Sequence, residues 1–176
     1  MVRFGVILMV ICVAASLVLA VTYKVTRPLI DAQEKAERTE ALKDVLENVQ
    51  RFEERMLGET SYFEAYDQNN NRVGYVLSAK AKGYGGQIDM LVGITDDGTV
   101  QGVRILSHSE TPGLGSQIND IKYKEKKPWF TRQFQKKRLD ELDFSRIQAI
   151  TGATISSKAV LEGVKESVSD FLARTR

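Results

Sequence analysis

A run of 20 residues without a charged side chain, from Phe4 to Tyr23, constrains this sequence more than any other feature. At about 1.5 Å of rise per residue, a helix over this run reaches about 30 Å, the thickness of the hydrocarbon core of a bilayer. A cleaved secretory signal is the alternative, since Val18-Leu19-Ala20 has the small residues of a cleavage site. The run is longer than the roughly 7–15 apolar residues of such a signal. We therefore expect a transmembrane anchor over residues 1–24, held in a lipid bilayer.

The charges beside the run leave its orientation open. Arg3 stands on one side, and Lys24 and Arg27 stand on the other, so basic residues do not mark a cytoplasmic side. The remainder of the chain is balanced, because Arg3 and Lys24 account for the formal net charge of +2. The one dense basic run, KYKEKKPW, is typical of a solvated loop. We therefore expect no nucleic-acid partner, since such binders concentrate positive charge on one face.

Cysteine and histidine are almost missing from the sequence. Cys12 lies inside the apolar run, so the rest of the chain has no thiol for a disulfide or a cysteine-bound cluster. His108 is the single histidine. These residues do not suffice for a structural zinc site or for a nucleophilic Cys/His pair, and no spacing of carboxylates indicates another metal site. We expect no metal.

Residues 25–58 have the pattern of a stalk helix. Pro28 suits the first turn of a new helix, because its missing N–H needs no partner there. Apolar residues then recur at helical spacing among alternating charges: Leu29, Ala32, Ala36, Ala41, Val45, Leu46, Val49, Phe52 and Met56. We expect this helix to end near Gly58.

The remaining residues, 59–176, predict an α+β domain. SYFEAY and RVGYVLSA flank the turn-rich DQNNN, and IDMLVGIT and VQGVRILS flank DDGT. We therefore expect two hairpins and a small, mostly antiparallel sheet of four strands, with a short helix around PWFTRQF. A C-terminal helix is expected over residues 155–174, and it should pack on the sheet through one stripe: Val160, Val164, Val168 and Phe171.

Two glycine-rich loops separate these elements. KGYGGQ lies between the two hairpins, and HSETPGLGSQIND follows the last strand. Glycine lets a backbone approach a ligand closely because it has no Cβ, and the same residue type also suits tight connections. The loops alone leave both interpretations open.

The C-terminal helix begins in a cluster of hydroxyl side chains, AITGATISSKAV. Thr154 occupies the position of an N-cap, whose side chain accepts a hydrogen bond from a backbone N–H two or three residues later. Alternatively, the unpaired N–H groups and the positive end of the helix dipole hold a phosphate there. Gly152 and Ala153 would keep the approach of such a group open. The pattern alone favours the cap.

Three motifs resemble a known family in their order and spacing, namely GYGG, HSETPGLGSQI and TGATISSKAV. They are similar to motifs of the FMN-binding subunits of Rnf electron-transport complexes and of sodium-translocating NADH:quinone reductases. In that family, Ser/Thr-Gly-Ala-Thr ends in a threonine esterified to the phosphate of FMN. The resemblance therefore implies covalent FMN on Thr154, attached by a separate magnesium-dependent flavin transferase that uses FAD.

The resemblance also implies roles for other residues. It places Glu110, Thr111, Gly113 and Leu114 beside the isoalloxazine ring, Tyr84, Gly85 and Gly86 on its other side, and Thr151, Gly152, Ala153, Ile155, Ser156 and Lys158 around the attachment point. Lys158 would reach the phosphate, and His108 is expected to have no catalytic part. The family usually has an aspartate three residues before the first hydroxyl of the motif, where this sequence has Gln148. An amide lacks that charge, so attachment would be slower or would require a matched transferase.

The resemblance as a whole points to the G subunit of the Rnf complex. It implies a single-pass flavoprotein in the cytoplasmic (inner) membrane of a prokaryote, with its flavin domain on the extracytoplasmic side and with other membrane and peripheral subunits as partners. FMN would relay electrons between ferredoxin and NAD while sodium or protons move, and the chain alone is not expected to turn over a substrate. The alternatives are the C subunit of a sodium-translocating NADH:quinone reductase, which is generally longer, and a membrane-tethered binding module without FMN.

Overall fold

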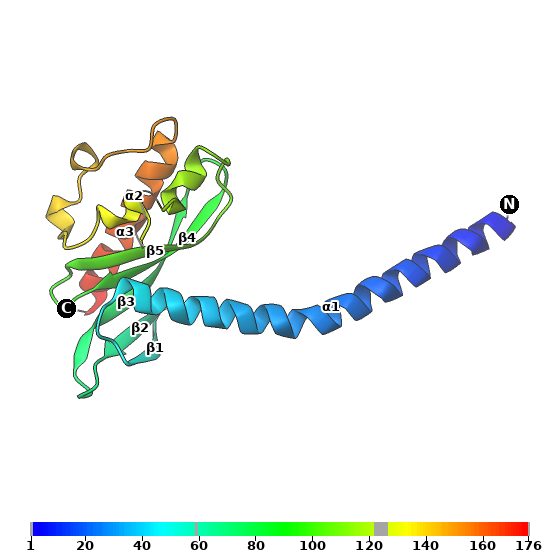
Figure 1. The fold of residues 1–176 in the computed structure, drawn as a ribbon, viewed down its shortest axis with the longest axis horizontal. Coiled ribbons are helices and arrows are strands. Elements are labelled where there is room, and N and C mark those ends of the chain that lie inside the picture. Colours follow the sequence, from blue (N-terminus) through cyan, green and yellow to red (C-terminus); the bar gives the residue numbers. More distant parts are fainter. Residues whose placement is uncertain (1, 59, 122–126, 176) are drawn as a thin grey trace. The chain divides into compact units, whose positions relative to one another are not determined.

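The computed structural model describes residues 2–58, 60–121 and 127–175, so most of the predicted basic loop at residues 122–129 lies outside the described residues. The chain divides into two compact units, Met1–Thr39 and Glu40–Arg176. The helices are α1 (Val2–Val45), α2 (Trp129–Arg132) and α3 (Thr154–Thr175) (Figure 1). The strands are β1 (Arg51–Leu57), β2 (Thr60–Tyr66), β3 (Arg72–Lys82), β4 (Gln87–Ile94) and β5 (Val100–His108).

Helix α1 runs without a break through Pro28, so the prediction that Pro28 starts a new helix is wrong. The segment after the proline is rich in Ala, Glu, Lys and Arg, which favour helix. Arg27 also pairs with Asp31 across the proline, at 2.9 Å between Nε and Oδ1. The helix therefore continues although proline removes one backbone hydrogen bond. By length and composition, α1 contains a stretch apolar enough to cross a membrane.

Helix α1 ends at Val45, earlier than the stalk predicted from the sequence. Asn48 has φ = 62°, a left-handed conformation typical of residues that end helices. Residues Arg51–Leu57, which were expected to be helical, form β1 and pair antiparallel with β2. The apolar residues Phe52 and Met56 fit a helical spacing, but pairing with the edge of a sheet outweighs that local pattern.

The sheet is an antiparallel meander in the order β1-β2-β3-β4-β5. The four predicted strands are present as β2 to β5, and the two predicted hairpins join β2 to β3 and β4 to β5. Strand β1 is a fifth strand, which the sequence did not predict. Because β3 ends where β4 begins and β5 ends beside the start of β4, both glycine-rich loops lie at the same end of the sheet.

The two faces of the sheet carry different partners (Figure 1). Helix α3 packs on one face, and its predicted apolar stripe is buried there: Val160, Val164, Val168 and Phe171. The last turns of α1 pack on the other face, where Leu42 and Val45 join a small core with Phe63, Val76 and Leu91. The alternation of side chains along each strand supplies both cores.

A pair of glycines sets how closely the end of α1 approaches the sheet. Gly93 of β4 and Gly102 of β5 lie opposite each other in the register. A Cβ at Gly93 would lie 2.3 Å from the carbonyl oxygen of Val45, and one at Gly102 would lie 2.9 Å from Val45 Cα. The last turn of α1 therefore fits only over strand positions without side chains.

Gly93→Ala should destabilise the domain by about 2 kcal/mol or more, because the new methyl group meets a backbone carbonyl that has no rotamer to change. Thermal unfolding of the full chain in detergent, followed by circular dichroism, measures the effect. Lys80→Ala, at an exposed position of β3, is the control and should change stability by less than about 0.5 kcal/mol. Equal melting temperatures for the wild type and Gly93→Ala would contradict this packing.

Candidate functional site

Three motifs that are far apart in the chain meet around Glu110, which follows the end of β5. Its side chain is buried, with 6% of its surface exposed. The backbone N–H of Gly85 donates to Glu110 Oε1 at 3.1 Å, and the hydroxyl of Ser156 donates to Oε2. One carboxylate therefore joins the loop after β3, the loop after β5 and the first turn of α3.

The glycines of both loops allow them to close around this carboxylate. A Cβ at Gly83 would lie 2.0 Å from Glu110 Oε1, and one at Gly115 would lie 2.4 Å from Oε2. At Gly85 a Cβ would meet the carbonyl oxygen of Ser109 at 2.1 Å. Packing of the protein on itself therefore requires these glycines. Sequence reasoning did not assign Gly83 and Gly115 to the site, because their role depends on where the Glu110 side chain packs, and its hydrogen-bond partners lie 25 and 46 positions away.

Two further glycines shape the turns that hold Leu114 near α3. Gly113 and Gly152 both have φ = 76°, a conformation that residues with a side chain rarely adopt. A Cβ at Gly152 would lie 3.1 Å from Leu114 Cδ2. The Leu114 side chain therefore lies against the turn that leads into α3.

Ser157, rather than Thr154, closes the turn at the start of α3. Its hydroxyl accepts a hydrogen bond from the N–H of Ile150 at 3.0 Å and donates to the carbonyl of Ala153 at 2.9 Å. Thr154 is the first residue of α3, and its exposed hydroxyl has no hydrogen-bond partner within the described part of the chain. The prediction of an N-cap at Thr154 is therefore wrong.

Helix geometry separates the four side chains of this turn. Successive residues of an α-helix project about 100° apart. Ser156 and Ser157 point inward, since they are 1% and 0% exposed and are hydrogen-bonded to the domain. Thr154 and Ile155 then project outward, and Ile155 is 56% exposed. The turn presents a hydroxyl beside an apolar side chain.

More apolar surface is exposed at this end of the domain. Tyr84 is 72% exposed in the loop that Gly85 ties to Glu110, and Leu114 is 46% exposed against the turn before α3. Large apolar side chains grouped on a surface mark a place where a ligand or partner binds. Tyr84, Leu114 and Ile155 expose such side chains on the three segments that meet at Glu110 or beside it.

The remaining predicted residues of the three motifs lie at the same end of the domain. Gly86 closes the turn between β3 and β4, where its carbonyl accepts a hydrogen bond from the N–H of Gly83 at 2.8 Å. Lys158 is exposed one turn into α3 and pairs with Glu162, at 3.6 Å between Nζ and Oε1. Of the others, Thr111 and Thr151 are exposed and Ala153 is buried.

Gln148 and His108 have local partners. The side-chain amide of Gln133 holds the backbone of Gln148 through two hydrogen bonds, at 2.8 Å and 3.1 Å, and leaves the Gln148 side chain exposed. His108 ends β5, and its Nδ1 accepts a hydrogen bond from the N–H of Glu110 at 3.4 Å. Among the described residues, no group of three or more His, Cys, Asp or Glu side chains could hold a metal ion.

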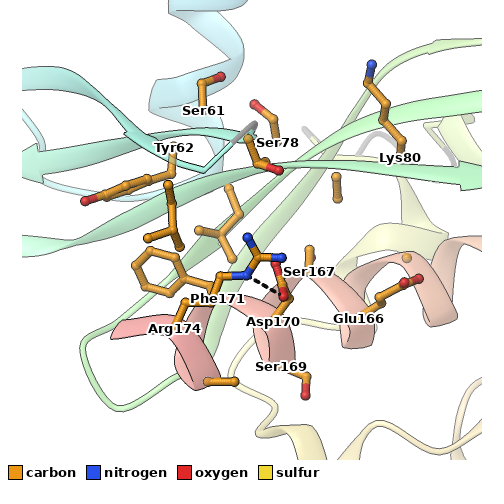
Figure 2. A pocket seen from close by; sticks show the side chains of 16 residues that line it. Ser61, Tyr62, Ser78, Lys80, Glu166, Ser167, Ser169, Asp170, Phe171 and Arg174 are labelled. Carbon is orange, nitrogen blue, oxygen red and sulfur yellow. Dashed lines mark hydrogen bonds and ion pairs between the residues drawn. The ribbon is translucent and has the colours of Figure 1, made fainter. Parts of the chain in front are cut away.

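A large hollow of about 880 Å³ lies elsewhere, between the sheet and the second half of α3 (Figure 2). Its lining includes Tyr62, Leu77, Ala79, Phe171 and the ion pair of Asp170 with Arg174. None of the predicted site residues lines it. Gly163 is the first lining residue along α3, and it lies about 14 Å along the helix axis from Thr154. The hollow is therefore separate from the turn at Thr154.

Comparison with known protein families matches two regions of the chain. Residues 83–169 match the FMN-binding domain, and residues 1–45 match the RnfG N-terminal region. The first match includes all three motifs that meet at Glu110.

Several relatives match nearly the whole chain. The G subunit of the proton-translocating ferredoxin:NAD(+) oxidoreductase complex of Clostridium ljungdahlii is 34% identical, covering 96% of this chain and 90% of that protein. The G subunit of the Na(+)-translocating ferredoxin:NAD(+) oxidoreductase complex of Acetobacterium woodii is 33% identical, with coverages of 96% and 90%. The G subunit of the ion-translocating oxidoreductase complex of Methanosarcina acetivorans is 32% identical, with coverages of 92% and 89%.

Two solved structures share the fold. The C subunit of the Na(+)-translocating NADH-quinone reductase of Parabacteroides distasonis has a TM-score of 0.57 and 18% identity, covering 80% of this chain and 91% of that one. NqrC of Shewanella oneidensis has a TM-score of 0.52 and 20% identity, with coverages of 65% and 61%. The two family matches and the relatives show that the chain belongs to the family of G subunits of ion-translocating (Rnf) oxidoreductase complexes and contains an FMN-binding domain.

Proposed function

We propose that the chain carries FMN as a phosphoester on Thr154 and relays electrons through it within a membrane-bound Rnf-type complex. One observation carries the proposal. Thr154 is exposed in the first turn of α3, where the two serine hydroxyls, on Ser156 and Ser157, are buried and hydrogen-bonded. An enzyme can therefore reach Thr154 from solvent while the turn stays folded.

The start of α3 also suits the phosphate of the ester. The backbone N–H groups of Thr154, Ile155 and Ser156 donate to no backbone or side-chain acceptor in the described residues. Unpaired N–H groups of a first turn, with the helix dipole, favour an anion by about 0.3–1 kcal/mol at an exposed site. An ester phosphate at Thr154 would be held and oriented by these groups.

Attachment requires a second enzyme, because a threonine hydroxyl is too weakly acidic to attack a diphosphate unaided. A magnesium-dependent flavin transferase would direct Thr154 Oγ1 onto the FMN-side phosphorus of FAD. The new P–O bond forms as the diphosphate bond breaks and AMP leaves, and the hydroxyl proton passes to a base of the transferase. Gln148, at the usual aspartate position, would make this step slower or specific to a matched transferase.

The exposed apolar side chains suit the isoalloxazine ring. Leu114 lies against the turn that precedes Thr154, and Tyr84 lies in the loop that is hydrogen-bonded to the carboxylate of Glu110. A ring tethered at Thr154 would cover the apolar surface of Leu114 and Ile155, with the Thr111 and Gly113 backbone near its polar edge and the Gly85–Gly86 loop on its other side. The bound flavin supplies the redox chemistry, and these residues bind and orient it.

The apolar part of α1 supports a place in the membrane. Its side chains are exposed over a stretch long enough to cross a bilayer. The relatives are named as subunits of ion-translocating complexes. The chain would therefore span the cytoplasmic membrane of a prokaryote beside other membrane and peripheral subunits, with its flavin domain on the extracytoplasmic side.

Two other functions fit less well. The shared fold alone would also suit the C subunit of a sodium-translocating NADH:quinone reductase. The sequence similarity to G subunits, however, extends over nearly the whole chain. A tethered binding module without FMN would need Thr154 only as a helix cap. Thr154 makes no capping hydrogen bond within the described residues.

Thr154→Val should abolish covalent flavin while the domain stays folded, because the substitution removes only an exposed hydroxyl without a described partner. The full chain is produced together with its transferase, and its intact mass is compared with that of the wild type, which should gain one FMN less a water. Thr151→Val, at the exposed threonine three residues before α3, is the control and should keep the added mass. Flavin retained in Thr154→Val would place the ester elsewhere.

Leu114→Ala should change the environment of the attached ring with little effect on attachment, because Leu114 lies against the turn and not on the hydroxyl. Visible absorption and a redox titration of the flavinylated chain measure this. A shift of about 30–60 mV in midpoint potential is expected, which corresponds to roughly a tenfold change in a two-electron or a one-electron flavin equilibrium. An identical spectrum and potential would remove Leu114 from the ring contact.

A further inference from the structure

Glu110 is the only charged side chain that is buried in the described part of the chain. Burying a carboxylate is unfavourable unless hydrogen bonds replace its hydration. An apolar residue would fill the same volume without that cost, so packing alone does not explain a glutamate here. Its two bonded donors belong to the segments that carry Tyr84 and Thr154.

We propose that Glu110 is a positioning residue that fixes the attachment point and the ring-binding loop relative to each other. This inference rests on the proposed function, in which Thr154 carries FMN. Glu110 itself touches neither the hydroxyl nor the phosphate. It acts through Ser156 on one side and through the N–H of Gly85 on the other.

The bond to Ser156 helps to hold the rotation of the first turn of α3, together with the buried Ser157. Ser156 lies two residues after Thr154, so the two side chains project about 200° apart around the helix. Holding Ser156 inward on Glu110 keeps Thr154 turned to solvent. If the bond is lost, the turn gains other orientations, and only a fraction of molecules presents the hydroxyl to the transferase.

The surrounding backbone leaves the carboxylate little freedom. Gly83 approaches Oε1 and Gly115 approaches Oε2 so closely that a Cβ at either position would overlap the carboxylate. The N–H of Gly85 then fixes the loop of Tyr84 to the same group. A change at Glu110 should therefore alter both the rate of attachment and the environment of the attached ring.

The test uses the full chain with its transferase and FAD, and measures the initial rate of FMN incorporation and the visible circular dichroism of the attached flavin. Ser156→Ala should lower the rate about tenfold, the factor expected for one lost hydrogen bond to a charged group, and Glu110→Ala should lower it at least as much, because it also loses the bond to Gly85. The double variant should be no slower than Glu110→Ala, because both changes break the same contact.

Glu110→Gln should restore most of the rate and the wild-type dichroism. Its amide oxygen can accept from the N–H of Gly85, and its amide N–H can donate to the oxygen of Ser156. Rescue by an amide separates positioning from a need for negative charge. If Glu110→Ala does not fold, Ser156→Ala and Glu110→Gln still decide the matter through the rate and the dichroism.

Two controls separate positioning from general stability. Ser167→Ala removes a hydroxyl that bonds only within α3, to the carbonyl of Val164, and should leave rate and dichroism unchanged. Gly93→Ala should lower the melting temperature without lowering the rate at a temperature where it is folded. Wild-type rates and dichroism in Ser156→Ala and Glu110→Ala, or losses that add in the double variant, would overturn the positioning role alone. A wild-type chain that takes up no FMN would overturn the proposed function, and the positioning role with it.

Discussion

The buried carboxylate of Glu110 is the constraint on which the rest of the site depends. A charge taken out of water must be compensated by donors, and here the donors come from Gly85 and Ser156, which lie in different segments. Satisfying this one side chain brings the loop of Tyr84 to the start of α3 and turns Ser156 inward. Thr154 then faces outward by helix geometry.

The sheet makes this convergence possible. In an antiparallel meander, the loop after β3 and the loop after β5 emerge at the same end, and α3 crosses one face with its first turn beside them. Glycine serves the fold in two places for the same reason, because it admits backbone or a carboxylate where a Cβ would clash. One place surrounds Glu110, and the other receives the last turn of α1 over Gly93 and Gly102.

Local patterns in the sequence predicted most helices and strands, but they did not predict the contacts between distant segments. Alternating strands bounded by turn residues predicted β2 to β5, and the stripe from Val160 to Phe171 predicted the face of α3, because both signals lie within a few residues. The end of α1 was misplaced, since β1 forms by pairing with β2 and not by its own pattern. The local pattern favoured a cap at Thr154, but that hydroxyl makes no such bond in the described residues, and Ser157 instead ties the start of the helix to Ile150. No local pattern predicted that the three motifs meet at Glu110, because this meeting depends on hydrogen-bond partners 25 and 46 positions away in the sequence.

The central claim is that the outward-facing hydroxyl of Thr154 carries the flavin phosphate. The most direct test is mass spectrometry of the chain purified from its native membranes. Trypsin should release the peptide from Ile147 to Lys158, and fragmentation should distinguish Thr154 from the other three hydroxyl residues within it. The account predicts one added FMN less a water on Thr154, and a bare peptide from active membranes would contradict it.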